Sequence, residues 1–456
     1  MRALADVARK MDQFYEFDRE PVHPDRLQPG RHFAGLFAGE HVAATEFVIG
    51  AFFVLHGVSL NDLLVGLLLG NLLAVLSWTF VCAPIAVQTR LTLYWYLRKI
   101  AGPGLTSIYN LANAVLYSIL AGAMIAVSAT AVGLVLSIPT PQLTDMYPKS
   151  FSWVALTFAI GVAFTILAIL GFDKLSRFAS VCSPWILVVF VSGAIASLSP
   201  LGVRPDLSNL IEIARNRIWN GVPTAGQEKF ALWHLVFFAW FANLAMHVGL
   251  SDMALFRYAR HWSYGLYSAF GMYPGHTLAW LCSGVMVAAI GREMHPGLMA
   301  YQALGIAGLV GVVLAGWTTA NPTLYRVGLA LQAVTGWPRW KVTLVAGLAT
   351  ALLASFPVFF MKLLDYVAIY GLVLMPIGAI VFAEHWIFPH LNLPRFKAEQ
   401  QGLWINWTVL LVWVGTLIAC YFMPLHLFFR WLPGYLLAIA SYTLLSWMGR
   451  RRQSHA

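Results

Sequence analysis

Charged residues are scarce in this sequence: Asp, Glu, Lys and Arg make up only 11% of its 456 residues, while 59% are hydrophobic. Because a soluble domain must cover much of its exterior with polar groups, this composition excludes an ordinary soluble protein. Apolar stretches of about 18 residues or more recur along the chain, close to the roughly 20 helical residues that cross a hydrocarbon core. These stretches are continuous rather than alternating, which argues against a β-barrel. The sequence therefore predicts an all-α polytopic membrane protein.

Cysteine is also scarce, and the motifs of several enzyme classes are missing. The four cysteines (Cys82, Cys182, Cys282 and Cys420) lie in apolar stretches without metal-ligand spacing, so we expect buried thiols, no disulfide and no metal centre. The chain lacks His-Glu-x-x-His, Gly-x-Ser-x-Gly and any nucleotide-binding motif, which argues against an intramembrane enzyme and against an ATP-driven pump. It also lacks the repeated pore-lining charge or the cytoplasmic domain of a channel or sensor. No apolar region precedes the first span, so residues 1–32 do not predict a cleavable signal peptide.

The apolar stretches predict about 12 transmembrane helices in a chain with a formal net charge of +10. The expected spans lie near 33–57, 61–87, 105–137, 151–170, 178–199, 231–255, 265–290, 300–333, 342–358, 363–387, 405–423 and 429–448. When the 29 Lys and Arg residues are sorted by the alternating loops, 21 fall on the side of the two termini and 8 on the other. The positive-inside rule therefore places both termini in the cytoplasm, as expected for a multi-pass protein of the cell (inner) membrane. This distribution accounts for the net positive charge through membrane topology. The lipid bilayer is therefore an expected partner, and nucleic acid is not.

The spans divide into two sets of five and a final pair. The expected regions are a cytoplasmic N-terminal segment at 1–32, a first five-helix repeat at 33–199, an external loop at 200–230, a second repeat at 231–387, two additional helices at 388–448 and a basic cytoplasmic tail at 449–456. Inverted-repeat transporters have this organisation, with the solute site where the two repeats meet. The pattern favours a secondary transporter of a small solute. It does not indicate an oligomeric state.

The first span of each set is unusually polar. Span 1 carries Glu46 near its middle, where an ionisable residue costs about 2.5–3.5 kcal/mol on insertion scales. No Lys or Arg in the same span can pair with it, so we expect a solute or cation contact, the alternative being a protonated glutamate bonded to a neighbouring helix. Glu40 and His41 lie nearer the inner interface. They are either solvated there or linked to proton movement.

Span 8 presents three residues on one helical face. Ala315, Thr318 and Thr319 stand at i, i+3 and i+4, and a carbonyl with two hydroxyls forms an oxygen site for a small hard cation. Val42 and Thr45 have a similar spacing on span 1, where a break in the helix would free their carbonyls. The alternative is that each threonine only bonds the carbonyl four residues before it.

Span 6 presents Trp240, Asn243 and His247 at i, i+3 and i+7. A flat aromatic with an amide beside it suits a planar heterocycle, through stacking on the face and hydrogen bonds at the edge. The alternatives are a Trp that only packs or anchors the helix at the interface, and a His247 that is either satisfied within the membrane or carries a proton.

Three stretches give the sequence a resemblance to a known family. They are WTTANPTLY at 317–325 followed by GLAL at 328–331, WFAN at 240–243 followed by SD at 251–252 and RYAR at 257–260, and PIGAI at 376–380 with Glu384 after it. These residues resemble the nucleobase–cation symporter family of cytosine, purine, hydantoin and allantoin permeases, and its cytosine-permease-like branch in particular.

The resemblance implies a five-plus-five inverted-repeat core of the leucine-transporter type with two additional helices. It also implies alternating access around a midplane site. The implied sodium ligands are the carbonyls of Val42, Thr45 and Ala315 and the hydroxyls of Thr318 and Thr319. A solute would lie beside Glu46, Tyr117, Trp240, Asn243 and Asn321. We expect no cofactor other than the coupling ion, Na⁺ or H⁺.

Some positions depart from the family pattern. Span 3 has Tyr117 in place of a stacking Trp, Ala121 in place of a Gln, and span 1 has Glu46 at a Gln-like position. A carboxylate there can bond two ring N–H groups of a base, pair with a cationic solute such as thiamine or its pyrimidine precursor, or carry a proton. The sequence thus predicts cation-coupled import of a nucleobase or related small heterocycle. A cationic pyrimidine, an amine or an amino acid is the alternative solute.

Overall fold

The computed structural model describes residues 15–141, 145–244, 247–291, 296–358 and 363–454. Over these residues the chain is helical, with two isolated β-bridges (Gln28 to Ala259 and Ser59 to Asn220) and no named strand. The all-α prediction is therefore confirmed.

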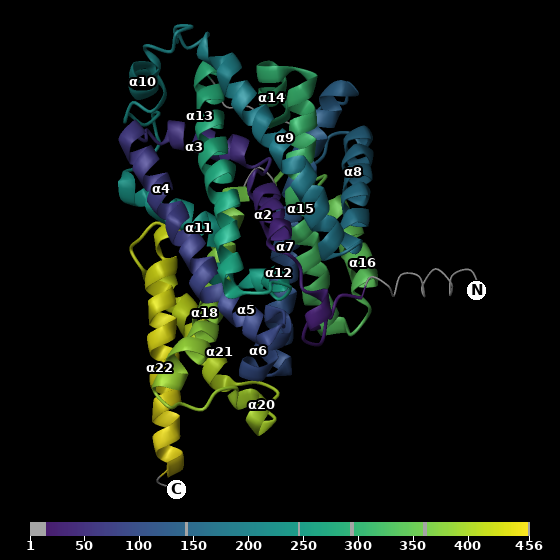
Figure 1. Cartoon of the computed structure of the whole chain (residues 1–456), viewed down its shortest axis with the longest axis vertical. Coiled ribbons are helices and arrows are strands. Elements are labelled where there is room, and N and C mark those ends of the chain that lie inside the picture. The colour runs from purple at the N-terminus through teal and green to yellow at the C-terminus, as the bar shows by residue number, and fades with distance from the viewer. Residues whose placement is uncertain (1–14, 142–144, 245–246, 292–295, 359–362, 455–456) are drawn as a thin grey trace, which may run out of the picture.

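The long helices follow the predicted spans. In chain order they are α2 (Gly30–His41), α3 (Glu46–Leu55), α4 (Leu60–Ser77), α7 (Pro103–Val135), α8 (Phe151–Ile169), α9 (Phe172–Leu198), α11 (Leu232–Leu244), α13 (Leu278–Ile290), α15 (Ile306–Thr335), α16 (Arg339–Leu353), α18 (Leu363–Phe382), α21 (Trp407–Phe422) and α22 (Trp431–Ser454). The shorter helices are α5 (Ala83–Thr89), α6 (Leu93–Ala101), α10 (Leu210–Ile213), α12 (Met253–Phe256), α14 (Pro296–Leu304), α19 (Phe388–His390) and α20 (Lys397–Gln401). Figure 1 shows the long helices packed side by side in one bundle.

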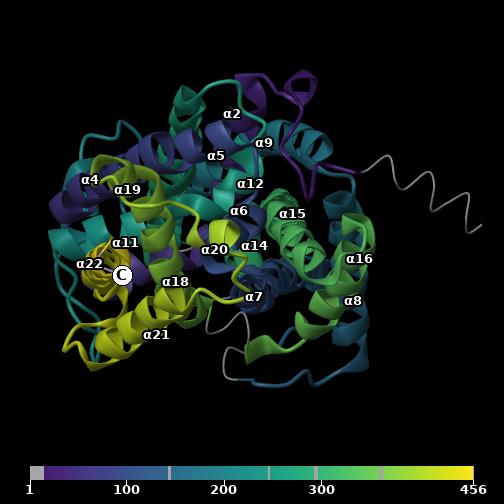
Figure 2. The ribbon, with the colours of Figure 1, turned by 90° about the horizontal axis from the view of Figure 1, so that it is seen from below.

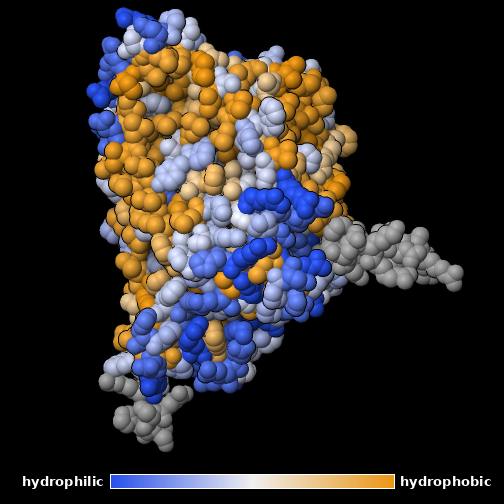
Figure 3. Space-filling view, viewed as in Figure 1, coloured by the Kyte–Doolittle hydropathy of each residue, from blue (hydrophilic) through white to orange (hydrophobic). Residues whose placement is uncertain are grey.

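Hydrophobic side chains cover the flank of this bundle. Five described helices are long and apolar enough to cross a membrane, and the bent pair α2 and α3 adds a sixth span. Figure 3 shows the apolar surface over the upper and middle part of one face, and hydrophilic residues gathered at the lower end. Exposed Leu68, Phe80 and Val115 belong to this flank, which in water would be a large unfavourable apolar surface. A lipid environment accounts for it.

Two spans are interrupted in the middle. Between α2 and α3 the chain bends by 53° across a break of four residues. In span 6, α11 ends at Leu244, and the chain continues through a 3₁₀ segment at His247–Asp252 into α12. These breaks fall at the polar positions that the sequence singled out, and they leave irregular backbone at membrane depth, where it is tolerated only inside protein or beside a cavity.

The centre of the bundle is formed by α7 and α15, which pack along each other. Small residues allow this approach: a Cβ added to Gly316 would lie 2.0 Å from Ser128 Oγ and 2.8 Å from the Met124 carbonyl oxygen. Around them, α3 packs on α13, α4 on α11 and α8 on α16. Figure 2 shows α21 and α22 on one flank beside α18, opposite α8 and α16.

Several predicted boundaries differ from the helix ends by about five residues or more, and two of them lie in the second repeat. The span expected at 300–333 begins at Ile306, because Gly305 has φ +61° and separates α15 from the short helix α14. The span expected at 342–358 ends its α-helix at Leu353. The four cysteines are free and buried, as expected.

Candidate functional site

The break in span 1 supplies buried backbone at the centre of the bundle. Helix α2 ends at His41, and the following Val42 has φ −101° and ψ 55°, outside the helical region. Helix α3 begins when the Glu46 N–H bonds the Ala43 carbonyl at 3.1 Å. Val42, Ala43 and Ala44 are all buried. Carbonyl groups in such a break leave the regular helical ladder and can face a ligand.

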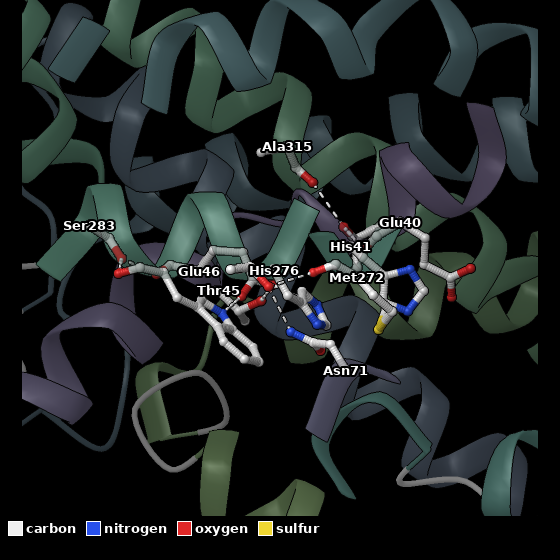
Figure 4. Close-up of polar contacts among 12 residues, drawn as sticks. Glu40, His41, Thr45, Glu46, Asn71, Met272, His276, Ser283 and Ala315 are labelled. Atoms are coloured by element: carbon white, nitrogen blue, oxygen red, sulfur yellow. Dashed lines mark hydrogen bonds and ion pairs between the residues drawn. The ribbon is translucent and has the colours of Figure 1, made fainter. Parts of the chain in front are cut away.

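The predicted stripe on α15 lies against this break. The Thr319 hydroxyl lies 3.0 Å from the Ala315 carbonyl oxygen and 3.1 Å from the Glu40 carbonyl oxygen on α2. Thr318 donates to Leu314 at 3.0 Å, with Ala315 at 3.2 Å. In Figure 4 a dashed line runs from Ala315 toward the end of α2. The structure thus joins the α15 stripe to span 1.

The span 1 residue that meets the stripe differs from the predicted pair. The carbonyl that contacts Thr319 belongs to Glu40, two residues before Val42. The side chain of Thr45 donates instead to Glu46 Oε1 at 3.2 Å. The spacing of span 1 could not fix this register, because the register depends on where α2 stops and how α15 crosses it.

Glu46 is buried, with 2% of its surface exposed, and it faces α13 and a π-helical segment at Gly271–Thr277. The Trp280 indole N–H donates to Glu46 Oε2, and His276 Nε2 lies 3.5 Å from Oε1. Ser283 donates to the Glu46 backbone carbonyl at 2.7 Å. This arrangement matches the alternative of a glutamate bonded to a neighbouring helix. A solute contact at Glu46 stays a prediction.

An aromatic column continues from this carboxylate. The Trp280 and His276 rings stack with centroids 4.5 Å apart, and His276 meets His41 edge-on at 4.9 Å. The His41 Nδ1 lies 2.9 Å from the Phe37 carbonyl oxygen, within its own helix. In the view of Figure 4, His276 and His41 lie between the side chains of Glu46 and Glu40. His41 is therefore buried rather than solvated.

The strongest ion-pair network in the site was not predicted. Arg326 on α15 is 2% exposed and forms a bidentate pair with Glu40, at 2.5 Å to Oε1 and 3.1 Å to Oε2. It also donates to Asp252, whose other oxygen accepts from Trp78 Nε1 at 2.5 Å. Of the two alternatives for Glu40, solvation at the interface does not fit, because its carboxylate is tied to a buried arginine. A link of Glu40 to proton movement stays a prediction. The signal that could have found Arg326 is its position, because an arginine inside an apolar stretch is itself an indication of function.

The remaining predicted solute residues lie in two places. Tyr117 on α7 is buried, meets Tyr370 of α18 edge-on at 5.7 Å, and lies under Arg326 at 5.9 Å. Trp240 donates to Ser77 of α4 at 3.0 Å and meets Trp431 of α22 at 4.9 Å. The two rings have different neighbours in this conformation, so they do not form a stacking pair.

Asn321 is buried on α15, and its amide nitrogen and oxygen find no hydrogen-bond partner among the described residues. A buried unpaired amide is costly, which makes Asn321 available for a polar ligand. The side chains of Asn243 and His247 lie outside the described residues, so their predicted roles stay predictions.

Comparison with known proteins gives a match at the level of structure. No protein-family model and no curated protein matches this sequence. A structure of Mhp1, described as a nucleobase-cation-symport-1 family transporter in a closed conformation with bromovinylhydantoin bound, is similar with a TM-score of 0.72 and 15% identity, covering 96% of each chain.

Two further solved structures agree with this match. The inward-facing conformation of Mhp1 has a TM-score of 0.70 at 16% identity, over 94% of this chain and 95% of the other. A Na⁺-coupled sialic acid symporter in an outward-open state has a TM-score of 0.68 at 12% identity, over 92% and 90%.

At these identities the likeness establishes the fold rather than the solute, because one fold hosts many functions. The likeness extends over nearly the whole chain. The chain is therefore a multi-pass membrane protein with the leucine-transporter-type fold, a five-plus-five inverted-repeat core followed by two additional helices.

Proposed function

We propose that this protein is a secondary transporter of the nucleobase–cation symporter family that imports a nucleobase or related small heterocycle together with a cation. The observation that carries the proposal is the meeting of Thr319 with the Ala315 and Glu40 carbonyls beside the break in span 1. We further propose that it lies in the cell (inner) membrane with both termini in the cytoplasm, on the asymmetry of Lys and Arg.

The oxygen atoms at this junction suit a sodium ion. When a threonine hydroxyl donates its proton to a helix carbonyl, its lone pairs remain free to face a cation. Thr318 makes this bond to Leu314 and Thr319 makes it to Ala315. Carbonyls in the break after Glu40 complete such a site in transporters with discontinuous helices. The ion would then hold α2 against α15.

The solute class rests on the chemistry of the nearby polar groups. Asn321 has unpaired donor and acceptor atoms, and Glu46 already accepts an N–H from Trp280. Both groups suit a ring with N–H and carbonyl groups at its edge, and the Mhp1 structure holds a hydantoin. A cationic pyrimidine is the second candidate, because the buried Glu46 carboxylate would favour a positive charge.

The test is thermal stabilisation of the purified protein by a panel of nucleobases, hydantoins, thiamine precursors and amino acids, in sodium and in potassium buffer. Thr319→Val should abolish the sodium effect. Thr323→Val is the matched control, since the Thr323 hydroxyl donates to the Thr319 carbonyl at 2.7 Å, one turn away in the same helix.

A heterocycle that stabilises the protein in sodium, but not in potassium or in Thr319→Val, would support the proposal. Stabilisation that is independent of sodium but depends on pH would assign the coupling to protons. Stabilisation by amino acids alone would overturn the proposed solute class and leave the fold intact.

A further inference from the structure

A second cavity lies away from the solute and cation site. It has a volume of about 540 Å³ and opens between the N-terminal segment, α6 and α20. These two helices lie at the lower end of the molecule in Figure 1, the end at which α22 also finishes. Leu91, Leu403, Trp95 and Trp404 supply apolar walls.

The charged part of the lining is basic. Arg19, Arg98 and Lys99 line the cavity together with one carboxylate, Glu399, which pairs with Lys99 at 3.1 Å. Among the described residues, no carboxylate forms an ion pair with Arg19 or Arg98. The Arg98 guanidinium lies 4.4 Å from the Trp95 ring centroid, and the buried Trp95 N–H finds no acceptor in the described chain. Arg98 thus lines the cavity without an anionic partner, and Arg19 lines it from the N-terminal segment while donating one hydrogen bond to the Gly336 carbonyl oxygen.

The cavity lies at the level where two membrane helices begin. Pro103, the first residue of α7, lines it, and Trp404 precedes the start of α21 at Trp407 by three residues. Trp404 and Trp407 are 69% and 65% exposed, as expected for aromatic anchors at the membrane–water interface.

An apolar surface continues from the cavity toward the middle of the membrane. Helices α7 and α21 meet through Tyr109 and Trp413, with ring centroids 5.7 Å apart. Exposed apolar side chains continue along both helices: Ile108, Leu111, Val115, Leu411 and Val414. A basic cavity at the interface is therefore continuous with a lipid-facing apolar track.

We propose that this cavity binds the headgroup phosphate of an anionic phospholipid, whose acyl chains lie along α7 and α21. Arg98, held over the Trp95 ring, supplies charge-assisted hydrogen bonds to phosphate oxygens, and Arg19 adds a second cation from the N-terminal segment. Basic pockets between membrane helices on the cytoplasmic side recognise anionic lipids in this way. A free phosphate ion could bind the basic side chains, but it would not contact the exposed apolar residues of α7 and α21.

The experiment measures lipid retention by native mass spectrometry of the full-length, detergent-purified protein. Phosphatidylglycerol and phosphatidylcholine with the same acyl chains are titrated in parallel. The variant Arg98→Gln should weaken phosphatidylglycerol binding by about fivefold, the effect of one basic residue near an anionic surface. Arg215→Gln is the matched control, because Arg215 is exposed on the external loop.

Arg19→Gln removes the second cation from an exposed position in the N-terminal segment, so it should also weaken phosphatidylglycerol binding while the protein remains folded. This variant decides the question if Arg98→Gln fails to fold. Equal retention of the two lipids, or equal effects of Arg98→Gln and Arg215→Gln, would overturn the proposal. Thermal stabilisation by inorganic phosphate equal to that by phosphatidylglycerol would overturn it too, since the cavity would then bind the ion and not the lipid.

Discussion

At the scale of single residues, Arg326 is a buried charge that links α15 to both broken spans. It joins Glu40 of α2 to Asp252 of the 3₁₀ segment, so one cation on α15 holds the carboxylates of both broken spans. Removing one partner of a buried ion pair leaves an uncompensated charge, which costs about 3–5 kcal/mol. Removal of the Arg326 charge leaves the carboxylates of Glu40 and Asp252 without a counter-charge. Removal of the Glu40 charge leaves Arg326 still paired with Asp252.

We therefore predict that Arg326→Gln lowers the midpoint of thermal unfolding far more than Glu40→Gln does. Arg204→Gln, at an exposed arginine on the loop between α9 and α11, should change it little. The measurement is thermal unfolding in detergent, followed by intrinsic tryptophan fluorescence. Equal losses for Arg326→Gln and Arg204→Gln would show that the cluster contributes no net stability.

Glu46 gives a second prediction, based on its role as an acceptor. A Gln at position 46 can still accept from the Trp280 N–H through its amide oxygen, so Glu46→Gln should change stability little. Glu46→Ala removes the acceptor and leaves a buried N–H unpaired, which should cost about 1–3 kcal/mol. Thermal unfolding of both variants tests this contrast, and an equal loss in both would indicate that the negative charge itself is required.

The sequence predicted some residues of the site but not the contacts between them. Glu46 and the α15 threonines could be found because polar side chains stand out within apolar stretches. The partners of Glu46 could not be found, since its bond to Trp280 joins positions 234 apart and a Trp in a membrane helix has many possible roles. Asp252 was noticed as part of an interruption, but its pairing with Arg326 depends on how α15 passes the 3₁₀ segment.

At the scale of elements, the contact of α3 with α13 positions Glu46. Gly50 makes this contact close: a Cβ there would lie 1.7 Å from Ser283 Oγ and 2.6 Å from the Trp280 carbonyl oxygen. We predict that Gly50→Ala destabilises the protein by about 1–3 kcal/mol, the usual effect of overpacking.

Gly415→Ala on α21 is the matched control, since a Cβ at Gly415 meets no atom within 4 Å. It should be neutral or slightly stabilising, because Ala favours helix more than Gly does. Thermal unfolding of the two variants is the measurement. If Gly50→Ala is as stable as Gly415→Ala, α3 and α13 can separate without loss, and the packing around Glu46 is looser than the structure indicates.

The sequence predicted the existence of elements better than their register. The breaks in spans 1 and 6 followed from polar interruptions, because backbone freed at membrane depth needs partners. The start of α15 was missed because α14 and α15 read as one apolar stretch, and only the positive φ of Gly305 separates them. The contact of Thr319 with the Glu40 carbonyl was not predicted for a related reason: the stop of α2 is set by tertiary contacts. The roles of Val42 and Thr45 as cation ligands stay predictions.

At the scale of the whole molecule, the N-terminal segment ties several helices together at one end. Glu16 accepts from the Phe172 N–H at the start of α9 at 2.6 Å, and its backbone carbonyl accepts from the Tyr258 hydroxyl at 3.0 Å. Arg257 donates to the Phe17 carbonyl at 2.6 Å and to the Tyr325 hydroxyl of α15 at 3.1 Å. The segment thus links α9, the end of span 6 and α15. Opening at this end must break these contacts.

We predict that Glu16→Ala favours opening at this end, because it leaves the first N–H group of α9 without its acceptor. Loss of such a hydrogen bond to a charged group, about 1.5–3 kcal/mol, would raise the open population by roughly tenfold or more. The reporter is Cys82, which is fully buried. It is kept as the sole cysteine, and the measured quantity is its rate of labelling by a maleimide.

Glu20→Ala is the matched control, since Glu20 lies in the same segment and accepts from the exposed Tyr15 hydroxyl at 2.9 Å. Faster labelling in Glu16→Ala than in Glu20→Ala is the expected result, and sodium should slow it if the cation holds α2 against α15. Equal rates in the two variants would mean that the segment covers this end without holding it closed.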